Sequence, residues 1–102
     1  YRYPPFVRLV RLTLKHTDVQ RLDAAAEVLA ARLTQRFMAR VIGPETPMIS
    51  RINDLHHRIL LIKFERELRP DAYKELLQAD LDAFQADERF KRIRLIVDVD
   101  PA

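Results

Sequence analysis

The sequence predicts an α+β fold with the element order β-α-β-β-α-β, in which a four-stranded antiparallel sheet carries two helices on one face in a ferredoxin-like arrangement. Two long stretches place apolar side chains at steps of three and four, which is typical of amphipathic helices. The segments around them alternate or are continuously apolar, which is typical of strands. Because crossovers are right-handed, both helices cover the same face. A second core would not fit, so residues 1–102 form a single domain.

The first strand and the first helix follow each other closely. Residues 6–15 alternate between apolar and polar side chains, which predicts a strand with one apolar and one basic face. The apolar set is Val10, Leu12 and Leu14, and the polar set is Arg11, Thr13 and Lys15. Thr17 and Gln20 then fit a capping box, and a helix near 18–39 is expected after it. Its apolar stripe comprises Val19, Leu22, Ala26, Leu29, Leu33 and Phe37.

The centre of the chain predicts two strands joined by a turn. Val41-Ile42 and Met48-Ile49 flank a break at Gly43-Pro44, which predicts a kinked strand at an edge of the sheet, where proline is tolerated. Asn53-Asp54 is a turn candidate. Residues 57–66 form the next strand, and its apolar side chains on both faces indicate an interior position in the sheet.

The second helix is expected to begin at Pro70-Asp71 and the last strand to span 91–99. The buried stripe of the helix comprises Tyr73, Leu76, Leu77, Leu81 and Phe84. One side of the last strand carries Ile93, Leu95, Val97 and Val99, and the other carries Arg92, Arg94, Ile96 and Asp98.

The predicted topology gathers basic side chains on the helix-free face of the sheet. The first strand lies beside the third and the fourth, so Arg11, Thr13 and Lys15 would neighbour Arg92 and Arg94. Such a face can attract a polyanion. Apolar side chains on the same face leave open that another domain covers part of it; these are Ile59, Leu61 and Ile96.

Composition excludes several kinds of site. The chain has no cysteine, which excludes disulfides and cysteine-ligated metal and suits a reducing cytoplasm. It has one glycine, Gly43, so no glycine-rich loop can hold a nucleotide phosphate. No apolar run reaches the length of a membrane span, and no signal peptide is visible. The chain does not begin with Met, and we expect it to be a domain of a larger protein.

Four short motifs, in order, carry a resemblance to a known family. They are Tyr3-Pro4-Pro5-Phe6 followed by Arg8-Leu9, Val41-Ile42-Gly43-Pro44 with Pro47, Leu60-Leu61-Ile62-Lys63, and Asp98-Val99-Asp100-Pro101. In this order and at these spacings the chain resembles the C-terminal domain of primosomal protein N′, the bacterial replication-restart helicase PriA. The resemblance covers essentially the whole chain.

The resemblance implies a non-catalytic accessory domain, folded like one small-subunit ribosomal protein, within an ATP-dependent DNA helicase. The motor would lie elsewhere in the parent protein, as would its ATP, magnesium and zinc, and this fragment would hold no cofactor. The implied partners are branched and single-stranded DNA, the acidic C-terminal tail of single-stranded DNA-binding protein, and the helicase core of the same chain. The implied location is the bacterial cytoplasm, at the nucleoid, without a membrane.

Two sets of candidate binding residues follow. The DNA-binding candidates are Arg8, Arg11, Arg51, Arg58, Lys63, Arg92 and Arg94, which could contact phosphates without reading sequence. They could equally keep an exposed face soluble or pair with a neighbouring domain. In the family, the tail pocket uses a basic residue near the start of the second helix and a polar residue one turn later. The resemblance places the polar position at Lys74 and the basic position near Pro70, where Arg66 and Arg69 are the candidates.

Other chemistry is disfavoured by the pattern. His56 and His57 are adjacent on a strand and point to opposite faces, so they cannot share a metal ion. Asp98 and Asp100 project to the same side, but beside Arg92 and Arg94 they favour a structural salt bridge over catalysis. We therefore expect no catalytic and no metal-binding residue.

Two other functions remain open. The main alternative is a ferredoxin-like protein-interaction or regulatory module that binds no nucleic acid and buries its open face against a partner. RNA binding through the sheet ranks last, because no aromatic side chain lies mid-strand on the open face.

Overall fold

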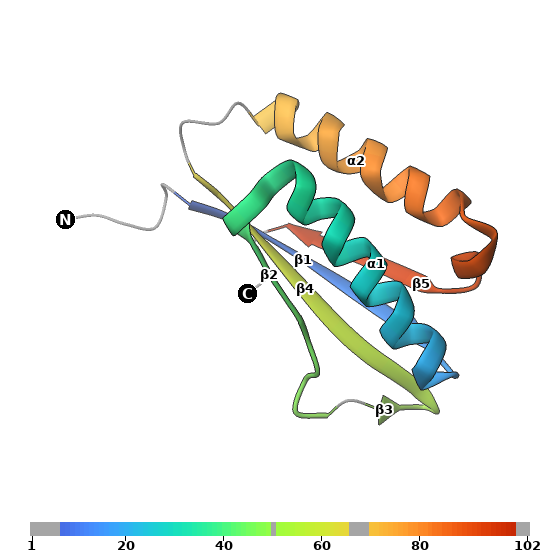
Figure 1. The fold of residues 1–102 in the computed structure, drawn as a ribbon. Helices are drawn as coiled ribbons and strands as arrows, with labels where there is room; N and C mark the ends of the chain where they lie inside the picture. The colour runs from blue at the N-terminus through green and yellow to red at the C-terminus, as the bar shows by residue number, and fades with distance from the viewer. Residues whose placement is uncertain (1–6, 50, 66–69, 100–102) are drawn as a thin grey trace.

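The computed structural model describes residues 7–49, 51–65 and 70–99, which form one sheet covered by two helices (Figure 1). In chain order the elements are β1 (Val7–His16), α1 (Val19–Phe37), β2 (Val41–Glu45), β3 (Arg51–Ile52), β4 (Leu55–Glu65), α2 (Pro70–Ala86) and β5 (Arg94–Val99). Short 3-10 turns, η2 (Met38–Arg40) and η3 (Glu88–Phe90), follow the two helices.

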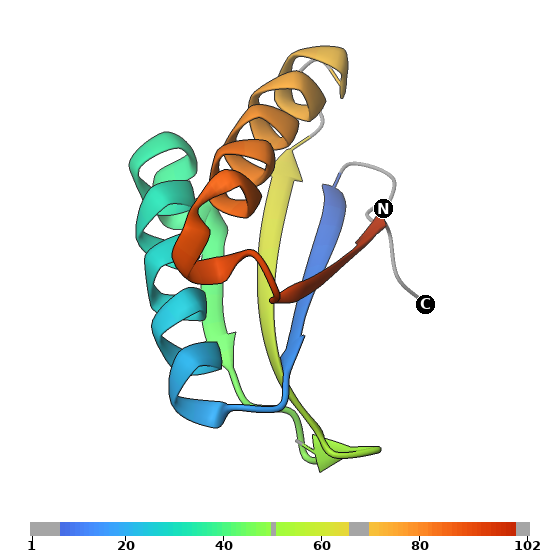
Figure 2. The ribbon, with the colours of Figure 1, turned by 90° about the vertical axis from the view of Figure 1, so that its right-hand side faces the viewer.

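The sheet has the predicted topology. Its strand order is β2-β4-β1-β5, every described pair is antiparallel, and the two-residue β3 adds a fifth strand against β4. β1 therefore lies between β4 and β5, as expected for a ferredoxin-like fold. Both helices cover the same face, which the view along the sheet shows (Figure 2).

The core lies between the helices and one face of the sheet. Val10, Leu12 and Leu14 of β1 are fully buried, as the alternation predicts. The helices contribute Leu22, Ala26, Leu29, Leu33, Phe37, Tyr73, Leu77, Leu81 and Phe84, all buried. The ring of Phe64 in β4 stacks on Tyr73 with a centroid distance of 4.0 Å, which fastens the start of α2 to the sheet. Each fully buried valine, leucine or phenylalanine side chain of this core contributes about 1.5–3 kcal/mol of transfer free energy.

The helix boundaries differ slightly from the expectation. Asp18, rather than Thr17, caps α1, because its carboxylate accepts hydrogen bonds from the backbone N–H groups of Gln20 and Arg21. Val19 is only half-buried, so the stripe of α1 begins at Leu22. In α2 the prediction of a buried Leu76 is wrong, because that side chain is 42% exposed beside the buried Leu77.

The middle of the chain confirms an edge strand and a tight turn. β2 ends at Glu45, so Met48-Ile49 does not continue it, and Met48 is fully exposed. Gly43 has a φ of +111°, and a Cβ there would lie 2.8 Å from the carbonyl oxygen of Ile59, so only glycine fits. Asn53 and Asp54 both have positive φ, which is the backbone of a two-residue type I′ hairpin turn.

Candidate nucleic-acid interface

The sheet face opposite the helices is the candidate interface, and we call it the open face. Directly paired residues of an antiparallel ladder share a face, so the register assigns its members. Among the described residues they are Leu9, Arg11, Thr13 and Lys15 of β1, His57, Ile59, Leu61 and Lys63 of β4, Arg94, Ile96 and Asp98 of β5, and Ile42 and Glu45 of β2.

A row of three basic side chains crosses the open face near one end. Lys15 pairs with His57 on one side and with Arg94 on the other, so the three lie side by side across β4, β1 and β5. We call this row the basic rung. Cross-strand neighbours of this kind have Cβ atoms about 5 Å apart. None of the three pairs with an acidic residue in the described ladders, and Arg94 is exposed.

The histidine of the basic rung is held in its neutral form. Partial burial lowers the pKa of His57 below its ordinary value, and the positive charge of Lys15 lowers it further. At neutral pH the rung therefore presents two positive charges and one neutral imidazole. Below its pKa, His57 would add a third positive charge.

The middle of the open face combines one ion pair with an apolar stripe. Arg11 faces Asp98 across the β1–β5 ladder, with 3.4 Å between Nη2 and Oδ2. Both side chains are about two-fifths exposed. Arg11 Nε is buried and has no hydrogen-bond partner within the described part of the chain. The next row carries Ile59, Thr13 and Ile96, so an apolar stripe separates the ion pair from the basic rung.

Four DNA-binding candidates lie away from the open face. Arg8 pairs with the buried Phe64 and so belongs to the helix-covered side of the sheet. Arg58 also lies on that side, where its Nε donates to Oδ1 of Asp23 on α1 at 2.7 Å. On its strand each of the two is an even number of residues from the buried core positions, so both side chains lie on the helix-covered side.

The other two candidates of this group lie outside the main ladders. Arg51 is on β3 at the hairpin tip, where it forms an exposed ion pair with Asp54 at 3.0 Å. The expectation of Arg92 on the last strand is wrong, because β5 begins at Arg94 and Arg92 lies in the preceding turn. η3 and the buried Ile93 take up the residues before the strand.

The structure thus brings Arg11, Lys63 and Arg94 together on the open face, with Lys63 beyond the apolar stripe, opposite Leu9. Lys15 lies on this face as the sequence analysis predicted, although it was not named as a contact residue. His57 was not predicted there; it is an even number of residues from Lys63 and Ile59 on β4, and that spacing was the available signal. Asp98 does form a structural ion pair, but with Arg11 rather than with the expected Arg92 or Arg94.

The peptide-binding candidates are only partly described. Lys74 is exposed on α2, and Arg66 and Arg69 lie outside the described residues. His56 pairs with His16 and His57 with Lys15, so the adjacent histidines do lie on opposite faces. The described residues contain no group of three or more side chains placed to hold a metal ion.

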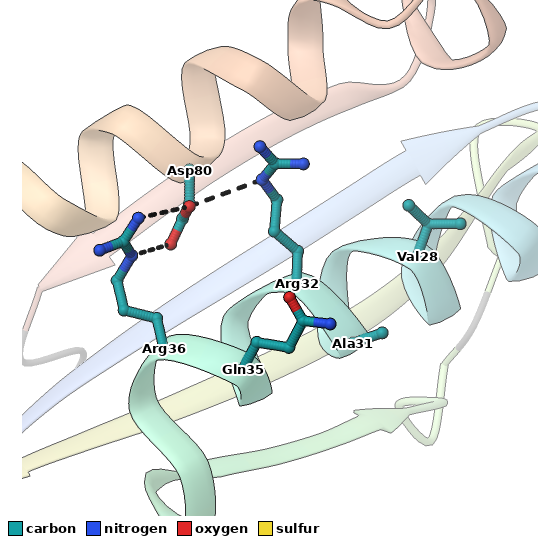
Figure 3. Close-up of a pocket in the computed structure, with 6 residues that line it drawn as sticks. All are labelled: Val28, Ala31, Arg32, Gln35, Arg36 and Asp80. Carbon is teal, nitrogen blue, oxygen red and sulfur yellow. Dashed lines mark hydrogen bonds and ion pairs between the residues drawn. The ribbon is translucent and has the colours of Figure 1, made fainter.

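The helix layer holds a charged cluster that the sequence analysis missed. Asp80 of α2 is 4% exposed and binds two arginines of α1 (Figure 3). Its carboxylate accepts from Arg36 Nε at 2.6 Å and from Arg36 Nη2 at 3.3 Å, and Arg32 Nε lies at 3.5 Å. The hydrogen bond to Asp80 raises the pKa of Arg36. A sequence signal existed, because Asp80 lies at helical spacing from the buried Tyr73, Leu77 and Phe84.

Together these features define a small ferredoxin-like α+β domain whose uncovered sheet face is basic at one end. The pattern of the family described as the primosomal protein N C-terminal domain matches residues 1–102, and the chain belongs to that family. It is 28% identical over 101 residues to the replication restart protein PriA of Bacillus subtilis (strain 168). That match covers 97% of this chain but 12% of the relative, so the chain corresponds to a small part of the longer protein.

A solved structure supports the fold alone. The de novo designed protein Foldit4 superposes with a TM-score of 0.66, covering 94% of this chain and 98% of the designed one, at 11% sequence identity. No helix among the described residues is both long and apolar enough to cross a membrane.

Proposed function

We propose that this chain is a non-catalytic accessory domain of a replication-restart DNA helicase and that its open face contributes to binding branched and single-stranded DNA. Membership in the primosomal protein N family supports the setting of DNA replication restart. The observation that carries the DNA part is the basic rung, where Lys15 and Arg94 lie side by side without an acidic partner in the described ladders.

The chemistry of the rung suits phosphates rather than bases. Lysine and arginine side chains bind backbone phosphates and carry no sequence information by themselves. The described residues of the open face include no Phe, Tyr or Trp that could stack on a base. Binding to the rung is therefore expected to be independent of sequence. With two or three phosphates neutralised, log K should fall with log salt concentration with a slope of about −2.

The acidic-tail part of the proposal concerns the other layer of the molecule. The start of α2, with Lys74 exposed on it, would provide one wall of a pocket for the acidic tail of single-stranded DNA-binding protein. The helicase core of the same chain would provide the rest. ATP, magnesium and zinc would bind in that core, and the parent would act in the bacterial cytoplasm at the nucleoid.

A titration of fluorescent forked DNA tests the DNA proposal. The chain should bind at low salt and release the fork as salt rises. Lys15→Ala and Arg94→Ala should each weaken binding, whereas Arg21→Ala should not, because Arg21 is an exposed arginine of α1 on the other side of the sheet. Equal binding by all three variants would remove the rung from the interface.

One observation favours a second function, a protein-interaction module. The apolar stripe of the open face, with Ile96 exposed and Ile59 half-buried, resembles the apolar centre and charged rim of a protein interface. If this is the function, the chain should not bind forked DNA even at low salt. It should instead dimerise as its concentration rises, and Ile96→Lys should abolish the dimer.

A further inference from the structure

A groove between α1 and α2 has the properties of a binding site for a carboxylate. It has a volume of about 590 Å³ and is lined by Val28, Ala31, Arg32, Gln35, Arg36 and Asp80 (Figure 3). All but Asp80 come from α1, and the groove belongs to the helix layer. The open face lies on the other side of the sheet (Figure 2). A ligand in the groove would therefore not compete for the surface proposed to bind DNA.

The charges in the groove do not cancel. Two guanidinium groups, of Arg32 and Arg36, share the single carboxylate of Asp80, which leaves a net charge of +1 among the lining residues. Asp80 is buried, whereas the arginine side chains are 45% and 39% exposed. The acid thus lies at the base of the groove and fixes the two cations at its mouth.

The arginines retain hydrogen-bond donors for a ligand. A guanidinium group has five N–H donors in a planar fork. The shortest approach of Arg32 to Asp80 is through Nε, at 3.5 Å, and no hydrogen bond of its two terminal nitrogens is recorded among the described residues. Arg36 uses Nε and Nη2, which leaves Nη1. The side chain of Gln35 lies on α1 next to Arg32, on the side away from Asp80 (Figure 3), and adds an amide to the lining.

The remaining lining distinguishes among anions. A single carboxylate matches the net charge of +1, whereas a phosphate dianion carries twice the charge that the lining leaves unbalanced. Val28 and Ala31 provide an apolar wall along the same side of α1. An apolar side chain next to the carboxylate would bury surface there, which a sugar–phosphate chain would not.

We propose that the α1–α2 groove binds a carboxylate of an acidic peptide segment from a partner protein, with Arg32 and Arg36 as its ligands and an apolar residue of the peptide against Val28. Asp80 is a positioning residue in this site, because it holds the arginines without touching the peptide. The site is distinct from the start of α2, where Lys74 lies, and it does not depend on the DNA proposal.

Amide chemical shifts of the ¹⁵N-labelled chain test the site, since the chain has its own closed core of buried residues. Three probes are compared: acetyl-Ala-Leu with a free carboxylate, acetyl-Ala-Leu-amide, and acetyl-Asp-Leu-amide. At least one of the charged probes should shift the amides of Arg32, Arg36 and Asp80, and the neutral amide should not. Binding by the first identifies a terminal carboxylate, and binding by the third identifies a side-chain carboxylate.

Variants separate binding from structure. Arg32→Ala should lower the affinity for the charged probe about fivefold, which is the effect of losing one half-exposed ion pair. Arg21→Ala should leave that affinity unchanged. Gln35→Glu adds a negative charge to the groove without removing a partner of Asp80, and it should also lower the affinity for the charged probe. A Lys15→Ala/Arg94→Ala variant should bind the peptide normally. Peptide binding is therefore tested independently of whether the open face binds DNA.

Several results would overturn the assignment. One is an equal response to the neutral amide, and another is unchanged binding by Arg32→Ala and Gln35→Glu. A third is a stronger response of these amides to inorganic phosphate or to an oligonucleotide than to either charged peptide. Shifts confined to Lys74 and the start of α2 would also remove the peptide from the groove.

Discussion

The open face and the α1–α2 groove use the same residue types in opposite ways. On the open face Lys15 and Arg94 lie next to each other, and no acid pairs with either in the described ladders. In the groove Arg32 and Arg36 are held by the buried Asp80. Neighbouring like charges without a counterion cost stability, which a polyanion can relieve by binding. In the groove, by contrast, the two arginines of α1 pair with the buried Asp80 of α2, so these charges hold the two helices together.

The comparison shows why a basic residue count does not locate an interface. Arg58 and Arg11 are both arginines on central strands, yet Arg58 is fixed to Asp23 on the helix side and is 13% exposed. Arg11 lies on the open face beside the more loosely bound Asp98. The face and the partner of a cation, rather than its presence, decide whether it can meet a ligand.

The largest expected effect concerns the buried acid. Asp80→Ala should lower the free energy of unfolding by about 2 kcal/mol, because it removes charge-assisted hydrogen bonds from a buried carboxylate. Asp98→Ala, the matched removal of an exposed acid, should cost under about 0.5 kcal/mol. Urea denaturation of both variants measures the difference. Equal losses would mean that the two ion pairs are alike in spite of their burial.

The next effect concerns the basic rung. Lys15→Ala and Arg94→Ala should each weaken binding of forked DNA about fivefold at low salt and raise the free energy of unfolding slightly, because each removes one of two neighbouring like charges. Fluorescence anisotropy at several salt concentrations measures both the affinity and the slope. Arg58→Ala is the control of opposite expectation, since it should destabilise the helix–sheet contact with Asp23 and leave DNA affinity intact.

The basic rung should make the stability of the chain depend on pH, because it contains His57. The pKa of His57 is lowered in the folded chain, so its protonated form is disfavoured there. As pH falls through its ordinary value near 6.5, the unfolded chain binds the proton first, and His57 then contributes a loss of stability. The charges nearest to it in the ladders are Lys15 opposite and Glu45 in the next row.

DNA binding should change in the other direction. A bound phosphate favours protonated His57, so affinity should rise between about pH 7 and pH 5. His57→Gln should remove most of this rise. The measurement is fork affinity against pH at constant salt for both proteins. A pH profile that His57→Gln leaves unchanged would separate His57 from the interface.

The smallest effect concerns the ion pair in the middle of the open face. Asp98→Asn releases Arg11 from its partner and removes one negative charge, so DNA affinity should rise about twofold. Asp82→Asn is the matched control, because it removes an exposed acid from α2 on the helix side. Anisotropy at low salt compares them, and an equal gain in both would indicate net charge rather than position.

Much of the fold could be predicted from the sequence because its signals are local. The alternation from Val10 to Lys15 indicates a half-buried strand, and the periodic stripe from Leu22 to Phe37 indicates a helix. Crossover handedness then places β1 between two strands. The boundaries were less certain. A threonine and an aspartate both precede α1, and only the structure shows that Asp18 is the cap.

The candidate site was predictable only in part, because side-chain partners depend on distant contacts. The alternation of β1 correctly placed Lys15 with Arg11 on the open face. The same alternation could have placed His57 there, and Arg8 and Arg58 with the core residues. The start of β5 depends on η3, which keeps Arg92 off the strand. The Arg36–Asp80 contact joins residues 44 positions apart, and no local pattern specifies that pairing.

The most direct test of the central claim is the salt dependence of forked-DNA binding by the chain and by its Lys15→Ala/Arg94→Ala double variant. The basic rung predicts a slope of log K against log salt concentration of about −2 for the chain, and a slope near zero with much weaker binding for the double variant. The same slope and affinity in both proteins would contradict a DNA contact at the open face.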